Sequence, residues 1–218
     1  MIEKTLLPMG TLRREAMGNY FLLNTVEKWA AVCIPKNGCS TLKAGVLEQA
    51  NIPFKNHAEI HSTIGYSEQS PFLTPISNGP PEDYFRFAIW RNPIDRFISV
   101  YQQFILDGVS HRRFNDKSGF GFDQFIDFTA WEHRKEIEKQ DEHLRAQSNF
   151  FRPEEVDTIV RIETLDVWFK NRKWPLPSRK NPSTSIFVPT SRQLRRVKRL
   201  YEADYCIEEY LNDDLQDN

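Results

Sequence analysis

The chain has 218 residues, of which 39% are hydrophobic and 13% aromatic, which is enough for one folded domain with a sizeable core. Its 29 basic and 30 acidic residues give a net charge of −1. No overall positive field therefore draws in nucleic acid, and any anion site must be local. No apolar run approaches the roughly 20 residues of a membrane span, and the N-terminus lacks a signal-like apolar core. If Met1 is the natural start, we expect a soluble cytoplasmic protein with a single domain over residues 1–218.

The cysteines are few and odd in number. Cys33, Cys39 and Cys206 form neither a paired framework nor a metal-ligand spacing, which favours a reducing compartment. We expect no metal site.

A strand, a turn and a helix start are predicted in the first strongly patterned stretch. The uncharged apolar run from Trp29 predicts a strand buried on both faces, ending at Pro35. The turn and the start of the helix read Lys36-Asn37-Gly38-Cys39-Ser40-Thr41. Because the first N–H groups of a helix lack partners within it and the helix dipole is positive there, this arrangement favours a phosphate. An ordinary strand-to-helix turn that happens to carry a lysine is the alternative.

The residues between this helix and the next strand contain two histidines. Residues 51–81 are rich in Pro, Ser, Gly and Asn, which predicts a long loop with short elements. His57 and His61 lie in it. Histidine suits general base catalysis because its unperturbed pKa lies near neutrality.

A second anion-binding element is predicted after the next strand. Residues 84–90 read as that strand, so Arg91 lies at its carboxyl end, where open α/β sheets bind ligands. On the capped helix that follows, Arg96 and Ser99 share a face. A surface ion pair between Arg96 and Asp95 would explain that arginine without any ligand.

Together these stretches resemble the sulfotransferases that use 3′-phosphoadenosine 5′-phosphosulfate (PAPS). The residues from Pro35 to Ser40 are similar to the family's phosphosulfate loop, Pro-Lys-x-Gly/Ala-Cys/Thr-Ser/Thr. The residues from Arg91 to Tyr101 match every fixed position of its second element, Arg-x-Pro-x-x-Arg-x-x-Ser-x-Tyr. The continuation Leu42-Lys43 is most similar to the carbohydrate sulfotransferase branch. The resemblance extends from about Trp29 to Tyr210.

The resemblance implies an α/β fold, with a central parallel sheet flanked by helices as in P-loop-like sulfotransferases. It also implies in-line transfer of a sulfuryl group from PAPS, as co-substrate, to a hydroxyl acceptor, which we expect to be a saccharide or a glycan-like alcohol. Lys36 would stabilise the bridging oxygen, and Arg91 with Ser99 would hold the 3′-phosphate. The 5′-phosphate would be held by Asn37, Gly38, Cys39, Ser40 and Thr41. Arg179 and Lys180, in a late loop, are further candidates for nucleotide binding, and the chemistry needs no metal.

The general base is expected among the histidines. Family members often carry a histidine soon after the first helix, so His61 is the first candidate and His57 the second. Asp141, His143 and Gln147 also resemble a family segment, Asp-x-His followed shortly by Gln. His143 is taken as a substrate-side or packing residue.

The C-terminal half contributes mostly charged surface in this reading. The run from Glu132 to Glu142 predicts a solvated helix surface. Residues 157–162 predict another parallel strand, and residues 191–211 a last helix. The last helix carries a basic stripe, either a solvated face or a contact with an acidic substrate: Arg192, Arg195, Arg196 and Arg199.

Two other function classes remain open at this stage. A nucleotide kinase or triphosphatase would share the strand, loop and helix, but Lys36 precedes Gly38, so the Gly-Lys-Ser/Thr order of the P-loop is missing. Such a protein would also leave Arg91 and Ser99 unexplained. A non-enzymatic module that binds an anionic glycan through the C-terminal basic stripe is the second alternative.

Overall fold

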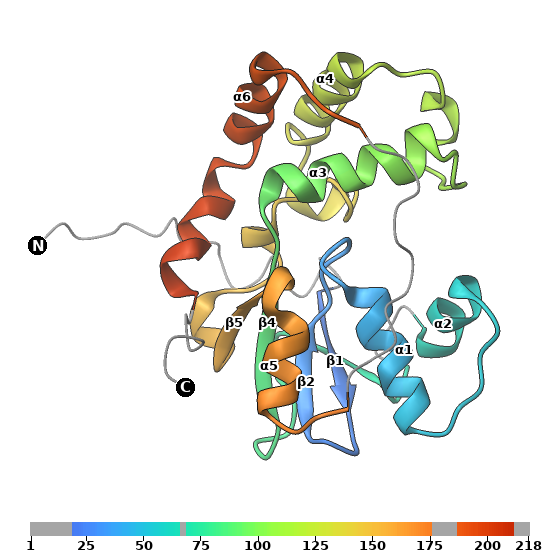
Figure 1. Ribbon diagram of the computed structural model, residues 1–218, viewed down its shortest axis with the longest axis vertical. Coiled ribbons are helices and arrows are strands. Elements are labelled where there is room, and N and C mark those ends of the chain that lie inside the picture. Colours follow the sequence, from blue (N-terminus) through green and yellow to red (C-terminus); the bar gives the residue numbers. More distant parts are fainter. Residues whose placement is uncertain (1–18, 66–68, 176–186, 212–218) are drawn as a thin grey trace, which may run out of the picture.

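A computed structural model describes residues 19–65, 69–175 and 187–211. Within these ranges one five-stranded sheet has the order β3-β1-β2-β4-β5, with helices around it (Figure 1). The strands are β1 (Tyr20–Asn24), β2 (Trp29–Val32), β3 (Leu73–Pro75), β4 (Phe85–Trp90) and β5 (Thr158–Arg161). The α-helices are α1 (Cys39–Gln49), α2 (His57–Ile64), α3 (Pro93–Tyr101), α4 (Phe122–Glu132), α5 (Leu165–Asn171) and α6 (Ser191–Leu200). No helix among these residues has the length and apolar character needed to cross a bilayer.

The sheet confirms the predicted α/β class, and it is mixed. Strands β2, β4 and β5 run parallel, with Phe87 opposite both Ala31 and Thr158. Strands β1 and β3 extend the sheet in antiparallel fashion. The short link from β1 to β2 explains the antiparallel pairing of these two strands, because neighbouring strands joined by a tight turn run antiparallel. Asn24 stabilises that turn, since its Oδ1 accepts hydrogen bonds from the N–H groups of Val26 and Glu27.

Both faces of the parallel strands are buried, as the uncharged runs predicted. All of β2 is buried, and alternate residues enter separate hydrophobic clusters. Trp29 and Ala31 pack with residues of α1, α2 and α5 on one face. Ala30 and Val32 pack on the other face with residues from the segments before β5 and after α6. A third cluster joins α3, α4 and α6.

The charged run after α4 does not form the predicted helix surface. Helix α4 ends at Glu132, whose side chain is buried and pairs with Lys135. The following residues make only turns and a short 3₁₀ segment (Ile137–Lys139), and Asp141 is 6% exposed. The last helix is also shorter than predicted, since a 3₁₀ segment (Glu202–Tyr210) follows α6.

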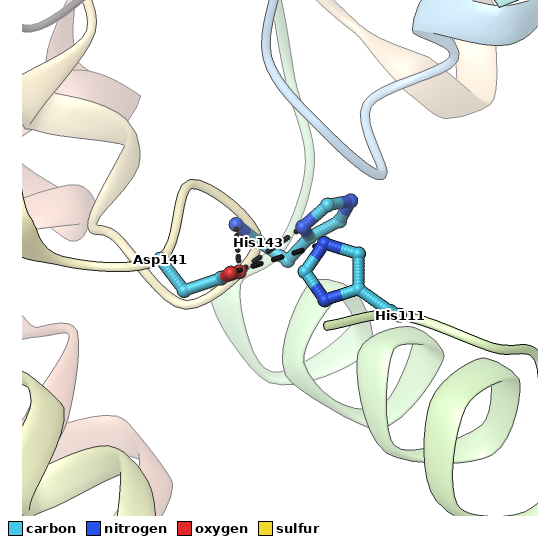
Figure 2. A group of neighbouring side chains, drawn as sticks. All are labelled: His111, Asp141 and His143. Carbon is cyan, nitrogen blue, oxygen red and sulfur yellow. Dashed lines mark hydrogen bonds and ion pairs between the residues drawn. The ribbon is translucent and has the colours of Figure 1, made fainter. Parts of the chain in front are cut away.

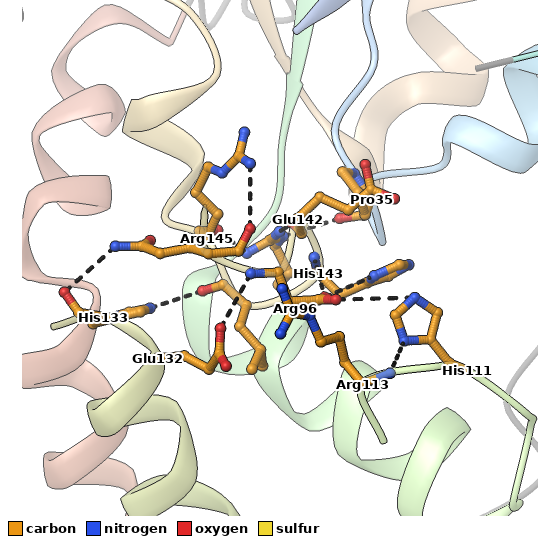
Figure 3. A network of polar contacts seen from close by, with 12 residues as sticks. Pro35, Arg96, His111, Arg113, Glu132, His133, Glu142, His143 and Arg145 are labelled. Atoms are coloured by element: carbon orange, nitrogen blue, oxygen red, sulfur yellow. Dashed lines mark hydrogen bonds and ion pairs between the residues drawn. The ribbon is translucent and has the colours of Figure 1, made fainter. Parts of the chain in front are cut away.

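The alternative explanation of Arg96, a surface ion pair with Asp95, is wrong, because Arg96 is buried. Its guanidinium donates to the carbonyl oxygens of Pro35 (3.0 Å), Arg145 (2.8 Å) and Glu142 (3.1 Å), and Figure 3 shows this network. One side chain of α3 thus holds the loop after β2 and the segment before β5.

We predict that Arg96→Met lowers the free energy of unfolding by about 3 kcal/mol or more, because hydrogen bonds from a charged donor contribute about 1.5–3 kcal/mol each and the bonds are not additive. Urea denaturation measures the change. The matched control is Arg195→Met on the exposed side of α6, which should change stability by less than about 0.5 kcal/mol. Equal stability of the two variants would contradict the role given to Arg96.

Candidate functional site

A pocket of about 890 Å³ opens where the parallel strands end. Its walls come from the loop after β2, from α2 and α3, and from the residues that follow β5. Open α/β sheets bind ligands at this edge. The predicted site residues that line it are Lys36, Gly38, Cys39, Ser40, Thr41, His57, His61, Arg91 and Ser99.

The loop between β2 and α1 has an unusual backbone. Lys36 and Gly38 both adopt left-handed conformations, with φ of 70° and 78°. Gly38 is the N-cap of α1 and, as a glycine, has no side chain with which to cap the first N–H groups of the helix. A lysine at positive φ is strained, and such strain concentrates at ligand sites. The helix start therefore faces the pocket with its dipole positive and a lysine beside it.

The two predicted anion-binding elements meet in this pocket. An Arg91 guanidinium nitrogen donates to the carbonyl oxygen of Lys36 at 2.9 Å. Lys36 donates in turn to the side-chain oxygen of Gln103. Burial and the charge of Arg91 lower the pKa of Lys36 to about 8. Burial also lowers the pKa of Arg91. Lys36 and Arg91 are thus two cationic residues that lie close together and are partly desolvated. A bound anion would stabilise the charged form of both.

The buried side chain of Gln147 connects these two elements, a role that the sequence alone does not predict. Its Nε2 donates to the Arg91 carbonyl at 2.9 Å, and its Oε1 accepts from the Arg91 N–H at 3.1 Å. The same oxygen accepts from the side-chain amide of Asn37, which also donates to the Ile89 carbonyl. Asn37 is therefore buried, and its side chain supports the loop.

The two predicted base candidates converge on Ser40. The Nε2 atoms of His57 and His61 lie 2.9 and 3.1 Å from Ser40 Oγ, and 3.1 Å from each other. Lys43 Nζ lies 3.3 Å from His61 Nδ1. Burial and Lys43 lower the pKa of His61 to about 3, and burial and Lys36 lower that of His57. Both rings are neutral in the unliganded pocket at neutral pH.

A third histidine, His143, lines the pocket beside Asp141 and His111 (Figure 2). Asp141 Oδ1 accepts from the backbone N–H and from Nδ1 of His143, both at 3.0 Å. Asp141 Oδ2 lies 3.9 Å from His111 Nε2. The three residues could also hold a metal ion, since their ligand atoms all lie within 4.8 Å of one another. The sequence spacing does not predict this group of three, because His111 lies in a different segment from Asp141 and His143.

Two predicted site residues cannot be placed. Arg179 and Lys180 lie outside the described residues. Phe187, which follows them in the sequence, is described, and its side chain lines the pocket.

Comparison with known proteins identifies the family. The family model described as "Sulfotransferase family" matches residues 19–173, well over half of the chain and all the pocket-lining segments except Phe187. Neither the curated proteins nor the solved structures gave a match. The chain therefore belongs to the sulfotransferase family, and sulfuryl transfer is the general chemistry that this membership indicates.

Proposed function

We propose that the protein transfers the sulfuryl group of PAPS to a hydroxyl group of a saccharide or a glycan-like alcohol. One observation carries the proposal: Lys36 and Arg91, which follow neighbouring parallel strands, are in contact and line one pocket. An adenosine with phosphates at its 5′ and 3′ positions requires two cationic groups in a single pocket. The similarity of Leu42-Lys43 to the carbohydrate branch supports a saccharide acceptor.

The residues divide between the two ends of the nucleotide. The start of α1 holds the 5′-phosphate through the backbone from Asn37 to Thr41 and the hydroxyls of Ser40 and Thr41. Arg91 and Ser99 hold the 3′-phosphate, where a guanidinium makes paired, charge-assisted contacts.

Lys36 stabilises the negative charge that grows on the bridging oxygen as the sulfur–oxygen bond to the 5′-phosphate breaks. In-line positioning and charge stabilisation are what this type of transfer requires of a protein.

His61 and His57 belong to the catalytic set, because their contact with Ser40 places both beside the loop that would hold the phosphosulfate. A histidine of the pocket takes the proton of the acceptor hydroxyl. Arg179 and Lys180 stay predicted nucleotide contacts. The three free cysteines support a reducing, cytoplasmic setting.

The nucleotide itself is the first test. We expect 3′,5′-adenosine bisphosphate to raise the melting temperature at concentrations where ATP does not, because a ligand that binds only the folded state stabilises it. Transfer of ³⁵S from labelled PAPS to a panel of saccharide, phenol, lipid and peptide alcohols then identifies the acceptor. Equal stabilisation by ATP, with no transfer from PAPS, would favour a kinase-like protein.

Arg91→Ala should weaken binding of 3′,5′-adenosine bisphosphate by 10- to 100-fold, since the contact contributes about 1.5–3 kcal/mol. Titration calorimetry measures the affinity, and the melting temperature shows whether the variant folds. Arg195→Ala is the control, because it removes an equal charge from an exposed face of α6. Unchanged affinity in folded Arg91→Ala would remove Arg91 from the site.

The pKa of Lys36 predicts a pH dependence of binding. With a free-state pKa of about 8, Lys36 is protonated at pH 7, and a bound phosphate raises this pKa further. Above pH 8 binding must take up a proton, so affinity for the bisphosphate should fall by up to about tenfold per pH unit. Calorimetry between pH 7 and 9 should show this slope in the wild type. Lys36→Met should bind more weakly and without the slope, and a slope that persists would assign the titration to another group.

A further inference from the structure

Three histidines line the pocket, His57, His61 and His143, and they differ in what faces the ring nitrogen that carries the lone pair. A lysine ammonium can only donate, so Lys43 occupies the Nδ1 lone pair of His61. The neutral ring of His61 then carries its hydrogen on Nε2, which is directed at Ser40 and His57. His57 Nε2 faces these same two groups. The lone pair of His61 is thus already directed at Lys43, and the Nε2 atom of His57 lies within hydrogen-bond distance of two protein groups.

His143 has the opposite arrangement. An ionised carboxylate can only accept, so the 3.0 Å contact with Asp141 Oδ1 places the ring hydrogen on Nδ1. Its Nε2 then carries a lone pair, and among the described residues no hydrogen bond to that atom is found. In Figure 2 this second nitrogen is turned away from Asp141, toward the loop between β2 and α1. The side chain lines the same pocket as Lys36.

The surroundings fix this orientation. Asp141 is buried, and its Oδ1 also accepts the backbone N–H of His143. The His143 ring packs edge-on against Phe104, with ring centroids 4.9 Å apart, and against His111 at 4.8 Å. Arg113 donates its backbone N–H to His111 Nδ1 at 3.3 Å, so the hydrogen of neutral His111 lies on Nε2, facing Asp141. Asp141 therefore accepts the Nδ1–H of His143, while His111 Nε2 lies 3.9 Å from its other oxygen, beyond hydrogen-bond distance.

We propose that His143 accepts the proton of the acceptor hydroxyl and that Asp141 is its positioning residue. This inference rests on the proposed sulfuryl transfer. The acceptor oxygen forms a bond to sulfur while its proton passes to His143 Nε2. The bond between sulfur and the bridging oxygen breaks, and the adenosine bisphosphate leaves with the electron pair. Asp141 stabilises the imidazolium that results, as the aspartate of a Ser-His-Asp triad stabilises its histidine.

A metal ion bound by His111, Asp141 and His143 is the rival explanation of the cluster. The local hydrogen bonds argue against it. A metal on His111 Nε2 would leave the hydrogen on Nδ1, facing the N–H of Arg113. A metal on His143 Nδ1 would replace a hydrogen bond that already has an ordinary length.

The decisive variant is His143→Ala in the full chain, assayed with ³⁵S-labelled PAPS and the acceptor panel, with water as the acceptor when none is added. We expect the rate to fall by about 10²–10⁴, the range for loss of a general base. Affinity for 3′,5′-adenosine bisphosphate should stay within twofold of the wild type. Added imidazole should restore activity to His143→Ala but not to His61→Ala, and it should leave the rate of Arg195→Ala unchanged.

Asp141 needs a readout that a purely structural role would not move. In ¹⁵N NMR spectra the neutral His143 ring should carry its hydrogen on Nδ1 in the wild type and mainly on Nε2 in Asp141→Ala, which removes the acceptor oxygen. The acidic limb of the pH–rate profile should shift in that variant. The NMR measurement of the tautomer does not require that the acceptor be known.

Several outcomes would overturn the inference while leaving the proposed function intact. They are a His143→Ala rate within threefold of the wild type, an Nε2–H tautomer in the wild type, or one equivalent of zinc in the purified protein that is lost in His111→Ala. Failure of the wild type to bind the bisphosphate or to transfer sulfate would count against the proposed function itself.

Discussion

The site depends on the hydrogen bonds made by the side-chain amide of Gln147. It pairs with both backbone groups of Arg91 and accepts from the side chain of Asn37, so one buried side chain sets the spacing between the ends of β2 and β4. The two partners of the Asn37 amide nitrogen are both oxygens, which fixes the orientation of that group. Asn37 Oδ1 is buried, and no described residue donates a hydrogen bond to it. An unpaired buried acceptor is costly, which indicates that the asparagine is present for its two donors.

The electrostatics of the pocket follow from this spacing. Lys36 and Arg91 are brought into contact and partly desolvated, and both pKa values are lowered. Burial and the charge of Lys43 similarly lower the pKa of His61 to about 3 and keep its ring neutral. The folded state therefore brings cationic groups close together, and an anionic ligand would reduce the electrostatic repulsion between them. Arg96 donates its guanidinium hydrogen bonds to the backbone carbonyls of Pro35, Arg145 and Glu142, so it supports the loops.

Local patterns of the sequence predicted the site-bearing elements well. The uncharged runs became β2 and β4 because both faces of these strands are covered. Lys36 and Arg91 lie at their carboxyl ends because parallel strands finish at one edge of the sheet. The antiparallel edge depends on the pairing of β1 with β2, which the periodicity of β1 alone does not reveal. Arg96 was misread because a helical wheel shows which residues share a face but not what that face contacts.

Asp141 shows most clearly where local reasoning stops. It belongs to a charged run that has the composition of a solvated surface, and yet it is buried between two imidazole rings. His143 lies two residues away in the same segment, but His111 comes from a segment that no sequence spacing relates to it. They meet because Arg96 and Gln147 hold the segment before β5 against α3 and the strand ends. A carboxylate in that position decides which nitrogen of His143 carries a hydrogen. The chemistry available to this histidine is therefore a property of the tertiary structure, although its residue type and the neighbouring aspartate can be read directly from the sequence.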